Sequence, residues 1–163
     1  MIEQTNIQLA HTVLVRCLEK KIKLAVAESC TGGLLSATLT QVQGISAVFW
    51  GGCVSYSNEA KMKLLGVPAH MIENYGAVSI EVAQMMAEGA LRIFQVDVAV
   101  AISGIAGPTG GSFEKPVGTV AIVAAHKNGT VLPTWHRFLG GRNDIQNQSV
   151  QHALLLVLKI AIM

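Results

Sequence analysis

Residues 23–43, KLAVAESCTGGLLSATLTQVQ, decide the fold because they join a buried strand directly to a helix. The apolar run 23–28 is typical of a strand covered on both faces. An amphipathic run then predicts a helix over 33–43, which Gly44 ends. A strand that leads into a helix begins a crossover unit, so this stretch favours an α/β fold with parallel strands.

The junction between the two elements, AESCTGG (27–33), is also the first candidate site. It places the hydroxyl of Ser29 where unpaired backbone N–H groups and the positive end of a helix dipole converge. Gly32 and Gly33 would let a ligand approach the backbone closely. This arrangement suits a serine nucleophile with an oxyanion hole, and it suits a bound phosphate equally well. Glu28 is open to two interpretations, as a group that orients the chemistry or as a structural carboxylate.

The remaining patterns predict four more strands, over 47–56, 97–103, 117–126 and 130–139, the last two forming a hairpin around Asn128-Gly129. Gly51-Gly52 inside the second strand implies a bulge or a close backbone contact. A helix is expected from Thr5, with a capping box to Gln8, and a short one after Pro68. Further helices are expected over 58–65 with Asn58 as N-cap, over 79–94 with Ser79 as N-cap, and over 142–163. This order predicts one domain over residues 1–163 with three layers and a mixed, mostly parallel sheet of about five strands.

Composition narrows the class of protein. Charged residues make up 13% of the 163 residues, against a usual share of about 25%, so we expect another subunit to cover part of the surface. A net charge of +2 without a basic run speaks against nucleic-acid binding. No signal peptide and no run of ~18 apolar residues are recognisable, so we expect a cytoplasmic protein without a membrane span. The cysteines and histidines show no metal-ligand spacing, so no metal or cofactor is expected.

The segment YSNEAK (56–61) offers a base for Ser29. Lys61 falls in the first turn of a predicted helix, where the dipole disfavours a cation and favours the neutral amine. A neutral lysine near a serine can remove the hydroxyl proton, and Tyr56 could relay protons or hold the lysine. The alternative is a solvated lysine beside a tyrosine that ends a strand.

Two further segments are candidates for ligand binding. SGIAGP (103–108) follows a strand, and its glycines expose N–H groups suited to an anion or a carbonyl oxygen, although an ordinary loop explains them equally well. Arg142 begins the final helix and could hold a phosphate, although an exposed arginine without a ligand is the more common case. Cys30 is a rival nucleophile, but it needs an oriented histidine, and all five histidines fall away from the glycine motifs. We therefore expect Cys30 to be buried and inert.

Together these segments make the chain resemble the CinA C-terminal domain family, the bacterial nicotinamide mononucleotide deamidases. The similarity runs from about residue 9 to 158 and includes AESCTGG, YSNEAK, LLGV (64–67), GAVS (76–79), SGIAGP and KPVGTV (115–120). It implies an α/β/α sandwich that forms homodimers or higher oligomers. It also implies hydrolysis of the carboxamide of nicotinamide mononucleotide, without a metal, to nicotinate mononucleotide and ammonia.

Position by position, the resemblance assigns the nucleophile to Ser29, the lysine to Lys61 and the tyrosine to Tyr56. The expected substrate contacts are Glu28, Thr31, Gly32, Gly33, Asn58, Ser103, Gly104, Gly107 and Arg142. Ser103 stands where relatives often carry threonine, which keeps the hydroxyl. Relatives often read Gly-Asp-Arg before the final helix, whereas this chain has Gly140-Gly141-Arg142 and lacks that carboxylate. Longer relatives carry an N-terminal pyrophosphatase-like domain, whose activity is not transferred here.

Two other functions remain open from the sequence: a module that binds a pyridine nucleotide without turnover, and a DNA-associated competence factor. The complete set of Ser29, Tyr56 and Lys61 argues against the first, and the near-neutral charge argues against the second. The final helix adds an expectation about assembly. Its apolar residues go all the way round, which predicts that the helix, or the surface beside it, takes part in a subunit interface.

Overall fold

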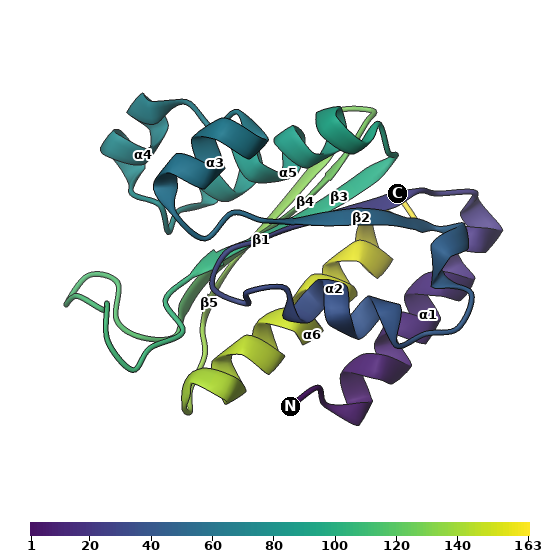
Figure 1. Cartoon of the computed structure of the whole chain (residues 1–163), viewed down its shortest axis with the longest axis horizontal. Helices are drawn as coiled ribbons and strands as arrows, with labels where there is room; N and C mark the ends of the chain where they lie inside the picture. Colours follow the sequence, from purple (N-terminus) through teal and green to yellow (C-terminus); the bar gives the residue numbers. More distant parts are fainter.

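The chain forms a five-stranded sheet between two layers of helices in a computed structural model that describes residues 1–163 (Figure 1). The strands are β1 (Leu24–Glu28), β2 (Phe49–Val54), β3 (Val98–Gly104), β4 (Thr119–His126) and β5 (Val131–Arg137). They lie in the order β2-β1-β3-β4-β5. β1 is parallel to β2 and β3, whereas β4 runs antiparallel to both of its neighbours, β3 and β5. The predicted mixed sheet with one hairpin is therefore confirmed.

Helices cover both faces of the sheet, as the predicted three layers require. α3 (Asn58–Leu65), α4 (Ala69–Tyr75) and α5 (Ile80–Phe94) lie on one face, and α1 (Gln4–Lys20), α2 (Leu34–Thr40) and α6 (Arg142–Ile160) on the other (Figure 1). A short 3-10 helix, Ile45–Ala47, precedes β2. Every residue of β1 is buried because it lies between the two layers, which explains its unbroken apolar run.

The ends of three helices differ from the sequence expectation. α1 begins at Gln4 after Glu3 and has no side-chain cap, so the predicted capping box does not form. α2 is shorter than predicted and covers only Leu34–Thr40. At α3 the N-cap is Ser57, not Asn58, because the Ser57 hydroxyl accepts from the Ala60 N–H at 3.1 Å. Ser79 caps α5 as predicted, accepting from the Val82 N–H at 3.2 Å.

Gly51 and Gly52 mark both a bulge and a close approach in β2, as predicted. The register steps from Leu24 opposite Phe49 to Ala25 opposite Gly51, which leaves one extra residue in β2. A Cβ at Gly51 would lie 2.6 Å from the ring of Phe94, and one at Gly52 would collide with the hydroxyl of Ser36 in α2. The absence of side chains therefore lets α2 and α5 pack close to β2 from its two faces.

α6 buries most of its apolar surface inside the chain. It packs against α1, α2, β3 and β4, and Leu154, Leu156, Val157 and Ile160 are buried there. Leu155 remains 45% exposed. The chain itself therefore accounts for most of the apolar residues that suggested an interface, and a homo-oligomer stays a prediction that light scattering can test. None of the helices has the length and apolar content of a membrane span.

Candidate active site

A pocket of about 290 Å³ opens where β1 and β3 end, and it brings together residues from five separate segments. The carboxyl ends of parallel strands are where loops of an open α/β sheet form binding crevices. Most of the predicted site residues line it. The lining consists of Ser29, Cys30, Tyr56, Asn58, Lys61, Ala77, Val78, Ser103, Gly104, Ile105, Ala106, Gly107, Thr109, Gly110 and Arg142.

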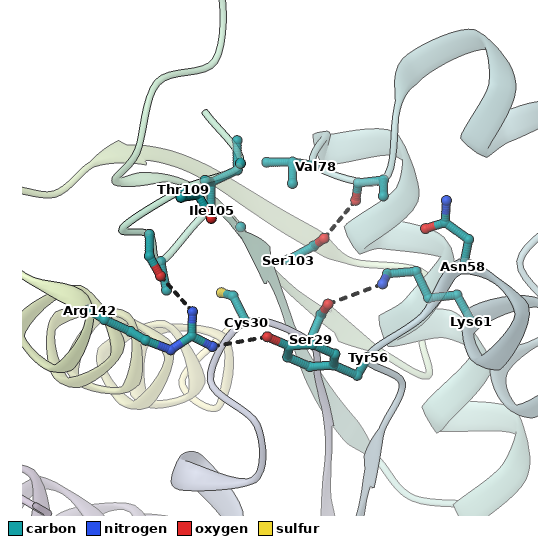
Figure 2. A pocket seen from close by; sticks show the side chains of 15 residues that line it. Ser29, Cys30, Tyr56, Asn58, Lys61, Val78, Ser103, Ile105, Thr109 and Arg142 are labelled. Atoms are coloured by element: carbon teal, nitrogen blue, oxygen red, sulfur yellow. Dashed lines mark hydrogen bonds between the residues drawn. The ribbon is translucent and has the colours of Figure 1, made fainter. Parts of the chain in front are cut away.

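Ser29 and Lys61 are in direct contact at one side of this pocket (Figure 2). The Lys61 Nζ donates to the Ser29 Oγ at 3.0 Å and to the carbonyl oxygen of Ser55 at 3.0 Å. Both side chains are nearly covered, since Ser29 is 7% and Lys61 2% exposed. The Ser29 hydroxyl is thus held beside a buried amine at the distance that a proton transfer needs.

The surroundings of Lys61 favour the neutral amine. Burial lowers the pKa of Lys61 below its ordinary value of 10.5. No carboxylate forms an ion pair with it, because the two ion pairs of the structure join Arg16 to Glu19 and Lys127 to Asp97. A buried lysine without a counter-charge releases its proton more readily than a solvated one, so it can act as a base.

Glu28 is fully buried and does not face the pocket. Its carboxylate accepts five hydrogen bonds, at 2.7–3.1 Å, from the Thr31 hydroxyl, the N–H groups of Gly33 and Leu35, and both the N–H and the hydroxyl of Ser36. It therefore occupies the N-terminal N–H groups of α2 and fixes the turn that carries Ser29. Glu28 therefore takes the structural role that was one of its two interpretations, and it does not line the pocket in which a substrate contact was expected.

Thr31, Gly32 and Gly33, the other expected substrate contacts of this turn, also lie outside the pocket. The N–H of Gly32 donates to the carbonyl oxygen of Ser29 at 3.0 Å, and that of Gly33 is held by Glu28. In the turn 29–33, only the N–H groups of Cys30 and Thr31 donate to no acceptor of the chain. Of these two residues only Cys30 lines the pocket, so its N–H is the candidate donor for an oxyanion beside Ser29.

Tyr56 and Arg142 close one side of the pocket together (Figure 2). One guanidinium nitrogen of Arg142 donates to the Tyr56 hydroxyl at 2.9 Å, and another donates to the Gly107 carbonyl oxygen at 2.7 Å. Both acceptors are neutral, so the charge of Arg142 is not matched by a carboxylate. The side chain of Arg142 is exposed, as a group that binds an anion must be.

The predicted loop residues Ser103, Gly104 and Gly107 all line the pocket, and so does Asn58 at the start of α3. The Ser103 hydroxyl donates to the carbonyl oxygen of Ala77 at 2.6 Å. A Cβ at Gly104 would lie 2.9 Å from the carbonyl oxygen of Thr119, so a larger residue does not fit there. This close packing keeps the end of β3 against the nucleophile turn.

Cys30 is buried, as expected, and its surroundings favour the protonated thiol. Its exposure is 6%, and burial raises the pKa of its thiol to about 12. None of the five histidines lines the pocket, so no imidazole is placed to activate either Cys30 or Ser29. The structure contains no group of three or more His, Cys, Asp or Glu side chains that could hold a metal ion.

Sequence reasoning missed several residues that shape the pocket. The Gln146 side chain donates to the Cys30 carbonyl oxygen at 2.9 Å and so supports the nucleophile turn from α6. Its position four residues after Arg142 was the available signal, because residues four apart share a helix face. Ala77 and Val78 belong to GAVS (76–79), one of the segments that carry the family resemblance, but as small or apolar residues in a connection between two helices they give no chemical signal of their own.

Comparisons with known proteins agree with this architecture. The sequence model of the family described as CinA C-terminal domain matches residues 6–161. A putative competence-damage inducible protein of Acetivibrio thermocellus is 49% identical over 150 residues, and a CinA-like protein of Mycobacterium sp. (strain JLS) is 52% identical over 134 residues. These alignments cover 92% and 82% of this chain. The chain spans only 36% and 32% of the two relatives' lengths, about a third.

Solved structures show the same fold at full length. The crystal structure of the competence/damage inducible protein CihA from Agrobacterium tumefaciens superposes with a TM-score of 0.93 at 40% identity and covers 98% of each chain. A CinA superfamily protein from Escherichia coli has a TM-score of 0.90 at 32% identity, covering all of this chain and 94% of that one.

Proposed function

We propose that this chain, which belongs to the CinA C-terminal domain family, is an amidohydrolase that converts nicotinamide mononucleotide to nicotinate mononucleotide and ammonia. The observation that carries the proposal is the contact of 3.0 Å between the Ser29 Oγ and the buried amine of Lys61. A protein that only binds a nucleotide has no need for a serine paired with a lysine whose pKa is lowered by burial.

In the acylation half-reaction, neutral Lys61 takes the hydroxyl proton of Ser29 as the Oγ attacks the carboxamide carbon. The carbonyl oxygen becomes an anion, and the N–H of Cys30, which lines the pocket and donates to no acceptor of the chain, is the available donor for it. Such a donor contributes about 2.7–4 kcal/mol to transition-state stability in known cases. The C–N bond then breaks, and protonated Lys61, assisted by Tyr56, transfers its proton to the departing amide nitrogen to give ammonia.

In the deacylation half-reaction, water attacks the ester carbon while Lys61 accepts a proton from that water. The bond between Ser29 Oγ and the acyl carbon breaks, and the proton on Lys61 returns to the serine oxygen. The product forms as the carboxylic acid and loses its remaining proton to solvent, so nicotinate mononucleotide leaves as a carboxylate, and one water has been consumed for each ammonia formed. Each step uses the same amine alternately as base and acid, as microscopic reversibility requires.

The ribose phosphate fits the opposite part of the pocket. Arg142 offers an exposed guanidinium whose present partners are a hydroxyl and a carbonyl oxygen, both weaker acceptors than a phosphate. Ser103, Asn58 and the glycines of the loop after β3 line the same pocket as Arg142 and Ser29. We assign the substrate contacts to these residues, with the phosphate bound to Arg142.

The test is hydrolysis of nicotinamide mononucleotide by the purified protein in the presence of EDTA, with ammonia and nicotinate mononucleotide measured in parallel. Equal amounts of the two products support the proposal. Free nicotinamide is the matched control substrate, because it has the same carboxamide and no phosphate for Arg142. No product from the mononucleotide, or equal rates with free nicotinamide, would contradict the assignment of substrate.

A further inference from the structure

Lys115 lies in the loop between β3 and β4 and reaches across to the connection between α4 and α5. Its Nζ donates to the carbonyl oxygen of Tyr75 at 2.9 Å and to that of Val78 at 2.8 Å. Its backbone is held in a turn, because the Lys115 N–H donates to the Ser112 hydroxyl at 3.0 Å and the Ser112 N–H donates to the Lys115 carbonyl oxygen at 2.9 Å. The Lys115 side chain therefore extends from a backbone turn that two hydrogen bonds hold in place.

The connection between α4 and α5 has a backbone conformation that brings two carbonyl oxygens to the Lys115 ammonium. Tyr75 is the last residue of α4, so its carbonyl oxygen lies at the negative end of the helix dipole and favours a cation. The next residue, Gly76, has a φ of 79°, and a Cβ there would lie 3.2 Å from the Lys115 Nζ. The chain turns closely around the ammonium and presents two carbonyl oxygens to it.

These two segments form adjoining walls of the pocket. Ala77 and Val78 line it from the α4–α5 connection, and Ile105, Thr109 and their neighbours line it from the loop after β3. Figure 2 shows Val78 beside Ile105 and Thr109, across the pocket from Tyr56. The side chain of Lys115 makes the only hydrogen bonds between residues 75–79 and residues 105–116. The hydrogen bond from the Ser103 hydroxyl to the Ala77 carbonyl oxygen joins the same connection to the end of β3, so beyond that point the separation of the two walls depends on Lys115.

We propose that Lys115 is a positioning residue that sets the width of the pocket at this end and so determines the affinity for the pyridine nucleotide. The inference rests on the proposed function for the identity of the ligand. Lys115 does not line the pocket, and Ser29 and Lys61 are carried by other elements, β1 to α2 and α3. Its loss should therefore weaken substrate binding while the chemical step proceeds at nearly its normal rate.

The variants that test this are Lys115→Met, which keeps the length of the side chain without its donors, and Lys115→Arg, which keeps donors and charge. Lys127→Met is the matched control. Lys127 also makes a close contact, at 2.6 Å to Asp97, but it lies beside the start of β3, at the end of the strands opposite to the pocket. We expect Lys115→Met to raise KM about tenfold, less than the full loss of two hydrogen bonds from a charged donor because these bonds position the wall and do not touch the ligand, with kcat within about twofold. Lys115→Arg should recover most of the affinity, and Lys127→Met should match the wild type.

Hydrogen–deuterium exchange without ligand gives a second readout, which does not depend on turnover. Lys115→Met should exchange faster over 75–79 and 105–114 alone, while thermal unfolding shows that the variant is folded. If the wild type does not hydrolyse nicotinamide mononucleotide, the proposed function fails, and the exchange pattern still decides whether Lys115 ties the walls. Unchanged KM and exchange in Lys115→Met would overturn the inference, and so would a loss confined to kcat.

Discussion

The Nζ of Lys61 lies 3.0 Å from the Oγ of Ser29, although 32 positions separate the two residues in the chain. The parallel pairing of β1 with β2 explains the contact, because Glu28 lies opposite Val54 and the Ser55 N–H donates to the Glu28 carbonyl oxygen at 2.8 Å. The chain leaves both strands at the same edge of the sheet. A serine directly after one strand therefore meets a lysine in the helix that follows the other.

Replacing Lys61 tests whether it acts as a base. Lys61→Arg should be nearly as damaging as Lys61→Met, and both should lower kcat by at least about 100-fold, the usual lower bound for losing a general base. Arginine keeps the charge but does not release its proton at any working pH. Steady-state ammonia release measures the effect. Near-normal turnover by Lys61→Arg would mean that the lysine serves only as a fixed cation.

The pH dependence of catalysis follows from the neutral amine. Because burial lowers the pKa of Lys61 below 10.5, a larger share of the amine is neutral near pH 8 than in a solvated lysine. We expect kcat/KM to rise with pH as Lys61 loses its proton, and to level off below pH 10.5 rather than above it. If kcat/KM instead falls as the pH rises over this range, a group other than Lys61 controls the pH dependence.

The same shift makes a prediction for stability. Below the lowered pKa the buried lysine is charged, and burial penalises that form relative to the unfolded chain. Between the lowered pKa and 10.5 the unfolded state binds more protons than the folded state, so the free energy of unfolding should rise with pH. Urea unfolding of wild type and Lys61→Met at several pH values isolates the effect. The wild type should gain on the variant as the pH rises, and a constant difference would contradict the lowered pKa.

Cys30 should be dispensable for the reaction. Its thiol pKa of about 12 leaves almost no thiolate near neutral pH, so Cys30→Ala should retain at least about a third of the wild-type kcat. Cys30→Ser keeps the volume of the side chain and controls for a small cavity beside Gly104. An inactive pair of variants together with an active Ser29→Ala would make this a thiol enzyme.

Glu28 should matter for folding more than for contact with substrate. In Glu28→Gln, one acceptor oxygen becomes an amide donor that faces donors of the 31–36 segment, so we expect a loss of about 2–3 kcal/mol in unfolding free energy. Glu81→Gln, at an exposed helix start, is the control and should change stability by less than about 1 kcal/mol. Chemical denaturation measures both, and an unchanged stability of Glu28→Gln would refute the structural role.

The sequence was sufficient for the sheet and for the meeting of Ser29 with Lys61 because both depend on local patterns. Strand β1 reads as an apolar run, and AESCTGG and YSNEAK each follow a strand, so their meeting at one sheet edge was foreseeable. The role of Glu28 was not foreseeable in the same way, because the direction of its side chain depends on how α2 packs over the end of β1. The turn 28–33 has hydrogen-bonding side chains at Glu28, Ser29 and Thr31. Only the structure shows that the Glu28 carboxylate accepts from the N–H groups at the start of α2.

Caps and pocket walls were the other features that the sequence left open. Ser57 and Asn58 are both residue types that favour the N-cap position, so the sequence does not distinguish them. Only the extended backbone at Ser57 shows that this residue is the N-cap. Lys115 begins KPVGTV (115–120) and is the one lysine of the glycine-rich loop after β3, but nothing in the sequence shows which groups its ammonium contacts. Its two carbonyl partners are 37 and 40 residues away along the chain, a separation that no local pattern encodes.

The most direct test of the account is kcat/KM for nicotinamide mononucleotide in Ser29→Ala, with circular dichroism and thermal unfolding to show that the variant keeps its fold. Ser29 is small and nearly buried, so its loss removes the nucleophile and little else. The account predicts a drop of at least about a thousandfold, the scale on which nucleophile removal acts in serine hydrolases. Retention of activity within about tenfold of the wild type would contradict it.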